Sequence, residues 1–563
     1  MTDFPSPPAA VPSARDAVQA ILTEEGLPPG FPAEVEAEVE ALRRSPGLDD
    51  PALVDLRALP FVTIDGPTSR DLDQALLVER DGDDLVVHYA IADASYFVRP
   101  GSALFAEALR RGASYYVPGR VVPMLPPALS EGLISLNPDG PRRAVVFTSR
   151  LDRDGHCRET TVRRALIQSQ AKLAFGQVQR FLDWLGVPNP ASDLAAGNAP
   201  PLIASIETAT APADGPRDPL ADRPFSESLR LLAMVGQLRM RDQQLRQVVR
   251  YRRVEVDVTL SDGDDSLMAV VASRGAVELY NEQLSLLCNS EGGLLLCRDD
   301  GGPVAQGIYR AHPAPPVSRL VELEALIAEL VSLHGLDDSW RWRRDDARGL
   351  SEFLMALPTD GPHARVAAAI QRQAIMTNLG AAYTDAPASH HGVGARPYAR
   401  FSAPMREVVG VFVHKELVEK LGLQARLADT LDESLRQQVI ASATRARDLQ
   451  GVLDARINRL VIDRLLQPDL SRPLAERPLR AATVMGLTAN KVHVQLDEPL
   501  LDMKLYRSDL EQSLGTPLRL TDSMAALRDH TGAIRLMVGG PVALRVDSFD
   551  RERDRWVLDL VPA

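Results

Sequence analysis

The sequence predicts a multidomain α+β protein with a large mixed α/β domain, a small helical N-terminal domain and a C-terminal OB-type β-barrel. Three observations support this prediction. The chain has 563 residues, enough for several domains, and its 45% apolar and 25% charged residues are typical of a globular protein. Strand and helix patterns alternate through its middle. A second set of short strands follows a proline-containing segment near the C-terminus.

Residues 1–52 are expected to form the small helical domain, which could be of the helix-turn-helix type and pack on the core. Residues 1–14 are rich in Pro, Ala and Ser, and helical stretches follow them. The repeat AEVEAEVEALRR fits an alternating strand or a helix, and its Ala and Glu content favours a helix. Residues 1–55 carry 11 acidic and 3 basic residues, a net charge of −8 out of −13 for the whole chain. This acidic segment should repel phosphate groups.

Residues 53–468 are expected to form the large mixed α/β domain. The stretches FVTID, ALLVE and LVVHYAIAD read as strands, and the last two are joined through RDGDD, which contains the Asp-Gly signal of a hairpin. Residues 166–250 and 317–465 have mainly helical periodicity. The segment DLSRPLAERP reads as a linker to the next domain.

Residues 474–563 are expected to form the OB-type barrel. Four short strand patterns, LRAATVMGL, KVHVQLD, PVALRVDSFD and RWVLDLV, have the spacing of such a barrel, although the insert 508–538 makes the count of strands uncertain. The segment carries 12 basic and 13 acidic residues, so any nucleic acid should bind to one face of it.

Cysteine usage and hydropathy indicate a cytoplasmic protein that has no contact with a membrane. Cys157, Cys288 and Cys297 form no CxxC pair and no cluster with zinc spacing, which fits a reducing compartment. No run of 18 apolar residues is long enough to span a bilayer. The N-terminus MTDFPSPPAAVPS lacks the basic and apolar segments of a signal peptide. We expect a monomer.

The stretch TIDGPTSRDLDQAL, which begins at residue 63, contains three aspartates behind a short apolar run. Asp65 ends the expected strand, and Asp71 and Asp73 are two positions apart, so all three carboxylates can converge. Carboxylates this close repel one another unless a proton or cation lies between them. Oxygen ligands with no His or Cys nearby suit Mg²⁺ or Mn²⁺, which favours phosphoryl chemistry. The alternative is a solvated acidic loop in which Asp71 or Asp73 caps a turn.

Several longer segments resemble the catalytic domain of ribonuclease II and ribonuclease R, the RNB family. They are DLRALPFVTIDGPTSRDLDQAL, YAIADASYFVRPGSAL, RRGASYYVPGRVVPMLPPALSEGLISLNP, SQAKLAF, YRAHPAP and YARFSAPMREVVGVFVHKEL, in this order. The C-terminal strands resemble the ribosomal S-one type OB domain of these enzymes. The resemblance implies a hydrolytic 3′–5′ exoribonuclease that uses Mg²⁺, binds single-stranded 3′ ends of RNA and releases nucleoside 5′-monophosphates. It also implies two N-terminal cold-shock barrels, for which residues 1–52 are too short.

The resemblance assigns Asp65, Asp71 and Asp73 to the metal, with Mn²⁺ as a possible substitute for Mg²⁺. Where the family has a fourth aspartate this chain has Gln74, whose amide can ligate a metal but brings no charge. Arg406 in SAPMREVV matches an arginine that can grip the scissile phosphate. We therefore expect an active enzyme in which one metal ion is bound weakly.

RNA-binding residues are also implied by the resemblance. Tyr116 matches one aromatic jaw that stacks on terminal bases, and Tyr251 is a weaker candidate for the opposite jaw. Phe175 and Glu282 correspond to the pair that reads the ribose, but Phe175 lacks the hydroxyl of the family's tyrosine. Lys172 is a candidate phosphate contact. Nearby basic residues could line an RNA channel or form a solvated face: Arg239, Arg241, Arg246, Arg250, Arg252 and Arg253.

Two alternative hypotheses for the function remain open. A catalytically impaired RNA-binding relative is conceivable because of Gln74, and because Ala446 stands where the family has an acid. A metal-dependent DNA nuclease is conceivable because of Phe175. The adjacent His390 and His391 point to different faces of any regular element, so they are interpreted as structural residues.

Overall fold

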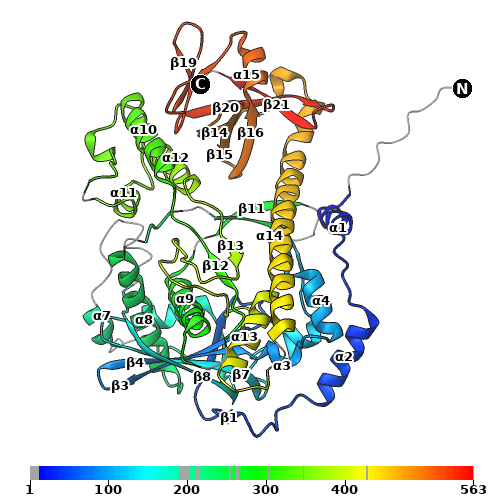
Figure 1. Cartoon of the computed structure of the whole chain (residues 1–563). Coiled ribbons are helices and arrows are strands. Elements are labelled where there is room, and N and C mark those ends of the chain that lie inside the picture. The colour runs from blue at the N-terminus through cyan, green and yellow to red at the C-terminus, as the bar shows by residue number, and fades with distance from the viewer. Residues whose placement is uncertain are drawn as a thin grey trace, which may run out of the picture.

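The structure is a computed structural model of the whole chain (Figure 1). It describes residues 12–188, 203–210, 216–246, 248–252, 255–261, 266–272, 274–301, 304–346, 348–426 and 429–561. Within these ranges, no helix combines the length and the apolar character that crossing a membrane requires.

A seven-stranded mixed sheet forms the base of the molecule in Figure 1, with strand order β1-β8-β7-β4-β3-β2-β9. The predicted hairpin is confirmed: β3 and β4 pair antiparallel, and Gly82 in the turn between them has a φ of +62°. β2 and β9 pair parallel at one edge, and β1 and β8 pair parallel at the other. The strands are β1 (Val54–Asp55), β2 (Val62–Asp65), β3 (Gln74–Asp81), β4 (Asp84–Ala92), β7 (Arg142–Leu151), β8 (Cys157–Ile167) and β9 (Ala171–Ala174).

Helices pack on this sheet and close one large hydrophobic core with it. α13 (Val408–Lys420) lies in its interior, because all 13 of its residues are buried. Its "VVGVFV" segment is apolar on every side, as a helix surrounded by protein requires. The other helices of this region are α3 (Ala94–Phe97), α4 (Ala103–Arg111), α5 (Phe175–Trp184), α7 (Ile203–Glu207), α8 (Ser226–Leu245) and α9 (Ala276–Cys297).

A second hydrophobic core lies at the C-terminal end. It joins a five-stranded antiparallel sheet, of order β16-β15-β14-β20-β21, to three helices and to the last turns of α14 (Asp429–Leu466). These helices are α10 (Val317–Leu333), α11 (Leu350–Ala356) and α12 (Ala364–Met376), so residues 317–376 share a core with the C-terminal sheet. The sheet strands are β14 (Arg480–Leu487), β15 (Lys491–Leu496), β16 (Leu501–Tyr506), β20 (Pro541–Asp550) and β21 (Arg555–Val561).

The insert between β16 and β20 contains α15 (Arg507–Leu514) and a small sheet of β17 (Arg519–Leu520), β18 (Ala526–Arg528) and β19 (Ile534–Met537). Two-stranded ribbons complete the fold: β5 (Tyr115–Val117) with β6 (Arg120–Val122), β10 (Glu255–Leu260) with β11 (Leu267–Ala272), and β12 (Tyr309–Ala311) with β13 (Ala382–Thr384). The long helix α14 connects the base of the molecule to the C-terminal sheet (Figure 1).

The N-terminal segment contains two helices, α1 (Ala14–Glu24) and α2 (Ala33–Arg44), as the sequence predicted. They pack on different parts of the chain. Val35 and Val39 of α2 join the large core, whereas Val18 and Leu22 of α1 join a third cluster with the β5–β6 ribbon and α14. A separate N-terminal domain, and its helix-turn-helix character, remain predictions.

Candidate active site

One cleft brings together segments that are far apart in the sequence. Its volume is about 810 Å³, and it is bounded by the end of β2, the β5–β6 ribbon, α9, the segment 398–407 and α14. Seven residues singled out from the sequence line it: Asp65, Gln74, Tyr116, Phe175, Glu282, Arg406 and Ala446. Asp71, Asp73, Lys172 and Tyr251 are not among the lining residues of this cleft.

Asp65 ends β2, and the loop after it leads to Asp71. Oδ1 of Asp65 accepts hydrogen bonds from the Gly66 N–H at 2.6 Å and from Ser69 Oγ at 2.9 Å. Burial raises the pKa of Asp71, and the negative charge of Asp65 raises it further, against the opposing effect of Arg406. Carboxylate oxygens are hard donors, and a divalent cation beside Asp71 would stabilise its ionised form. These two residues therefore fit Mg²⁺.

Asp73 has different partners. It is 2% exposed, and its carboxylate accepts hydrogen bonds from the Met405 N–H at 2.9 Å and from Arg406 Nε at 2.7 Å. Burial raises the pKa of Asp73 to about 6, so the carboxylate stays ionised at neutral pH beside the arginine. Within the described ranges, the three aspartates do not form a group whose ligand atoms all lie within 4.8 Å of one another. Asp73 thus holds the arginine segment.

Gln74, the first residue of β3, uses both ends of its amide. Oε1 accepts a hydrogen bond from the Tyr89 hydroxyl at 2.8 Å, and Nε2 donates to the Ser402 carbonyl. Tyr89 on β4 is buried, and its oxygen also lies 2.7 Å from Ser285 Oγ on α9. Gln74 therefore joins β3 to β4, to α9 and to the arginine segment.

The segment that carries Arg406 is held by Asn289 of α9, which is 1% exposed. Its Oδ1 accepts from the N–H groups of Phe401 at 2.7 Å and Ser402 at 3.0 Å, and its Nδ2 donates to the Tyr398 hydroxyl at 3.0 Å and to Ser402 Oγ at 3.1 Å. Sequence analysis did not identify Asn289. The one local signal was the Gly pair 292–293 within the helix, which lets α9 approach the segment 397–401 closely.

Glu407, next to Arg406, is fixed by a second network. Arg400 forms an ion pair with Glu407, and the Tyr383 hydroxyl donates to the same carboxylate at 3.0 Å. Burial would raise the pKa of Glu407, but Arg400 lowers it overall. Likewise, burial would lower the pKa of Arg406, but Asp73 raises it overall. The guanidinium of Arg406 is therefore a permanent cation at a defined place in the cleft.

Tyr116 lies on the β5–β6 ribbon with its side chain toward the cleft. It is 47% exposed, while Tyr115 and Val117 on the opposite face of the strand are buried, as the strand alternation requires. The amide of Gln450 on α14 bonds to both the N–H and the carbonyl of Tyr116 at 3.3 Å. Burial raises the pKa of Tyr116 to about 12, although Arg406 lowers it. The hydroxyl is neutral at physiological pH.

The other residues predicted to bind RNA are distributed around the cleft. Phe175 is the first residue of α5 and lines the cleft, and its side chain carries no hydroxyl. Glu282 of α9 pairs with Arg274 Nη2 at 3.0 Å. Lys172 on β9 donates to the Ser69 carbonyl, so it holds the loop between Asp65 and Asp71.

Tyr251 lines a neighbouring cavity of about 310 Å³, which shares Glu282 and Leu286 with the main cleft. Its hydroxyl donates to Asn378 Oδ1 at 3.3 Å. Four of the predicted channel arginines have structural partners, namely backbone carbonyls or Asp242: Arg239, Arg246, Arg250 and Arg252. Arg253 lies outside the described residues.

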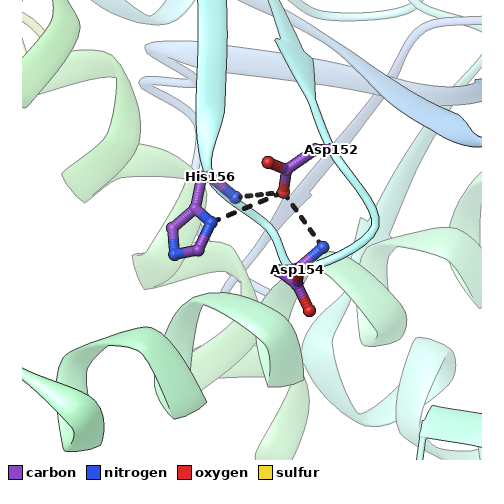
Figure 2. A group of neighbouring side chains, drawn as sticks. All are labelled: Asp152, Asp154 and His156. Atoms are coloured by element: carbon purple, nitrogen blue, oxygen red, sulfur yellow. Dashed lines mark hydrogen bonds and ion pairs between the residues drawn. The ribbon is translucent and has the colours of Figure 1, made fainter.

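Two groups of side chains elsewhere in the described ranges bring three possible metal ligands together. Figure 2 shows the first, Asp152, Asp154 and His156, in the turn between β7 and β8. Oδ1 of Asp152 accepts from the N–H groups of Asp154 and His156, both at 3.0 Å, so this carboxylate closes the turn.

The second group surrounds a lysine. Glu416, Glu419 and Asp432 accept from Lys415 Nζ at 2.8, 2.9 and 2.6 Å, so the ammonium already occupies its centre. His390 and His391 form no metal group with a third ligand in the described chain. The His390 N–H donates to the Ala395 carbonyl at 2.9 Å, and burial lowers the pKa of His390 to about 4. Their structural interpretation stays a prediction.

Comparisons with a family model and with known proteins indicate the same family. A family model described as the RNB domain matches residues 53–422. A ribonuclease R from Vibrio cholerae is 29% identical over 409 residues, which make up 71% of this chain and 43% of that protein. A ribonuclease R from Mycoplasma pneumoniae is 27% identical over 509 residues, 90% of this chain and 64% of that protein. The chain therefore spans less than two thirds of the length of these relatives.

Solved structures show the same fold. The structure of Mycoplasma genitalium RNase R in complex with ribose methylated single-stranded RNA has a TM-score of 0.77 and 20% identity, and the match covers 98% of this chain and 78% of that one. The structure of yeast Ssd1, described as a pseudonuclease, has a TM-score of 0.59 and 14% identity, with coverage of 92% and 58%. Because the RNB-domain model matches well over half of the sequence, this chain belongs to the RNB family.

Proposed function

We propose that this protein is a Mg²⁺-dependent, hydrolytic 3′–5′ exoribonuclease that degrades single-stranded RNA ends to nucleoside 5′-monophosphates. The observation that carries the proposal is the single cleft in which the Asp65 carboxylate, the Arg406 guanidinium and the Tyr116 ring meet. The proposal extends to a monomeric, cytoplasmic enzyme of RNA turnover. Mycoplasma genitalium RNase R has been solved with single-stranded and with double-stranded RNA, which supports RNA as the ligand class.

Each side chain in the cleft has a chemical part in this proposal. Asp65 and Asp71 would hold Mg²⁺ or Mn²⁺, which when bound neutralises phosphate charge and supplies a deprotonated water. Arg406 binds the scissile phosphate and stabilises the charge that develops on it. Tyr116 and Phe175 offer aromatic faces on which bases can stack without regard to sequence. Asp73 keeps Arg406 in place by its 2.7 Å bond.

Ribose recognition is assigned to Glu282, because Phe175 has no hydroxyl to bond a 2′-OH. Parallel assays on matched RNA and DNA oligomers test this assignment and the alternative of a DNA nuclease. RNA should be degraded at least tenfold faster than DNA, and Glu282→Ala should narrow the ratio. Equal rates on both polymers would favour the DNA nuclease.

The C-terminal domain, residues 474–563, is proposed to bind the RNA strand away from the cut. Lys491 and His493 on β15 lie opposite Tyr506 and Lys504 on β16, so one face of the sheet carries cations beside an aromatic ring. Lys491 Nζ lies 5.5 Å from the centre of the Tyr506 ring. Such a surface suits a polyanion with exposed bases.

The test is degradation of a 5′-labelled single-stranded RNA in Mg²⁺, with and without EDTA. The labelled strand should shorten progressively, nucleoside 5′-monophosphates should accumulate and EDTA should stop the reaction. A second candidate, an impaired RNA-binding relative, is favoured by Gln74 and by Ala446, which packs against Gly112 instead of presenting an acid to the cleft. RNA binding without degradation in either Mg²⁺ or Mn²⁺ would establish that candidate.

A further inference from the structure

Gln74 occupies the position at which the RNB resemblance expects a fourth acidic metal ligand, yet its amide is committed elsewhere. Its oxygen accepts the Tyr89 hydroxyl at 2.8 Å, and its nitrogen donates to the carbonyl of Ser402. An amide has one acceptor end and one donor end, and each has a partner here. The Gln74 oxygen therefore faces a donor and its nitrogen faces an acceptor, both from the protein.

The partners of Gln74 are themselves fixed. Tyr89 is 2% exposed, and burial raises its pKa, so its hydroxyl stays protonated and can donate. The same hydroxyl lies 2.7 Å from Ser285 Oγ on α9. Ser402 is 6% exposed and is held by Asn289, also of α9. A continuous chain of hydrogen bonds therefore runs from α9 through Gln74 and back to α9.

A carboxylate could not replace the amide in this network. A glutamate at position 74 would place a second acceptor against the Ser402 carbonyl, and an aspartate is one methylene too short to reach both partners. Leaving a buried carbonyl without a donor is costly, and opposing it with a negative charge costs more. The chemistry of the surroundings thus calls for a neutral amide.

Asp73 and Gln74 act on the same segment in consecutive positions. Asp73 holds the Met405 N–H and Arg406, and Gln74 holds Ser402. Together they attach the start of β3 to the segment on which Arg406 depends.

We propose that Gln74 is a positioning residue for the Arg406 segment and not a metal ligand. This inference rests on the proposed nuclease function. Loss of the Gln74 bridge should lower kcat, because Arg406 would be misplaced in the transition state, while metal affinity stays unchanged.

The experiment combines calorimetric titration with Mn²⁺ and steady-state kinetics on the full chain. The wild type sets the reference stoichiometry and affinity for Mn²⁺. Gln74→Leu should bind it with the same stoichiometry and an affinity within twofold, yet lose about tenfold in kcat with little change in KM. Asp71→Asn is the matched control, because it should lose Mn²⁺ binding itself.

Two further variants test the role of Gln74 through metal affinity and thermal stability, without an activity assay. Gln74→Glu should not raise Mn²⁺ affinity, whereas a side chain that reaches the ion would gain affinity with the added charge. Tyr89→Phe should lower thermal stability, and the double variant with Gln74→Leu should lose no more than the worse single variant. This cycle needs no activity, so it tests Gln74 even if the chain proves not to be a nuclease. A stoichiometry of two that falls to one in Gln74→Leu, or additive losses in the cycle, would overturn the inference.

Discussion

The two walls of the cleft are held very differently. The arginine wall, residues 398–407, is connected to Asp73, Gln74 and Asn289 from two other elements. The acidic wall, which Asp65 begins and which continues behind the cleft to Asp71, has fewer outside contacts: it is connected within itself, to Lys172, and through Arg70 to Ser135 and Glu131. The difference shows that the cationic half of the site is preorganised by the protein, whereas the acidic half retains electrostatic repulsion that a bound cation would relieve.

The largest effect that separates the walls is expected from two aspartate-to-asparagine variants. Asp73→Asn should lower kcat by about 10³-fold, because an amide nitrogen would face Arg406 and release it. Asp65→Asn should lower the rate by about 10²-fold through weaker metal binding. Raising Mn²⁺ should restore much of the rate of Asp65→Asn and little of Asp73→Asn. Equal rescue of both variants would show that Asp73 belongs to the metal site.

A second test addresses the arginine itself. Arg406→Lys should lower kcat by about 10²-fold, because an ammonium cannot reproduce the planar guanidinium that binds Asp73 and a phosphate together. Mn²⁺ affinity should be unchanged in calorimetry. Arg44→Ala, at an exposed position on α2, serves as the control and should behave as the wild type. Loss of metal binding in Arg406→Lys would contradict the separation of the two walls.

Asn289 holds the arginine wall by hydrogen bonds, so Asn289→Ala should lower both stability and kcat by an intermediate amount. Alanine removes the four hydrogen bonds of a side chain in a residue that is 1% exposed. The free energy of unfolding should therefore fall by about 1–3 kcal/mol for each buried group left unsatisfied. We expect kcat to fall about tenfold at a temperature where the variant is folded, with RNA affinity nearly unchanged. Thermal denaturation measures the change in stability, and steady-state assays measure the change in kcat. A destabilised variant with full kcat would mean that Asn289 supports the core alone.

The smallest effect concerns the N-terminal helix behind the Tyr116 ribbon. Val18→Ala should loosen the cluster that holds Tyr115 and Val117, and should raise KM for a short RNA roughly twofold to fivefold as stacking on Tyr116 weakens. Val39→Ala of α2 is equally buried but packs on the large core. Both variants should lose about 2 kcal/mol of stability, and only Val18→Ala should change KM. A matching KM change in Val39→Ala would remove the link between α1 and Tyr116.

Local features were predictable from the sequence because they depend on neighbouring residues. The β3–β4 hairpin followed from alternation and an Asp-Gly turn, and the helices from composition. The grouping of helices 317–376 with the C-terminal sheet could not be predicted, because amphipathic helices do not specify which core they cover.

The sequence by itself determined which residue types the region of the site contains: three carboxylates at and after the end of a strand, an arginine in its motif and an aromatic residue near them. Tertiary structure alone decided their partners. Gln74 meets Ser402 across 328 positions, and Asp73 meets Met405 across 332. Adjacent residues thus reach different groups of one distant segment, and no local pattern specifies such contacts. The physical reason is that a hydrogen bond depends on where its donor and acceptor lie in space, which the packing of α9, α13 and the sheet establishes only in the folded chain.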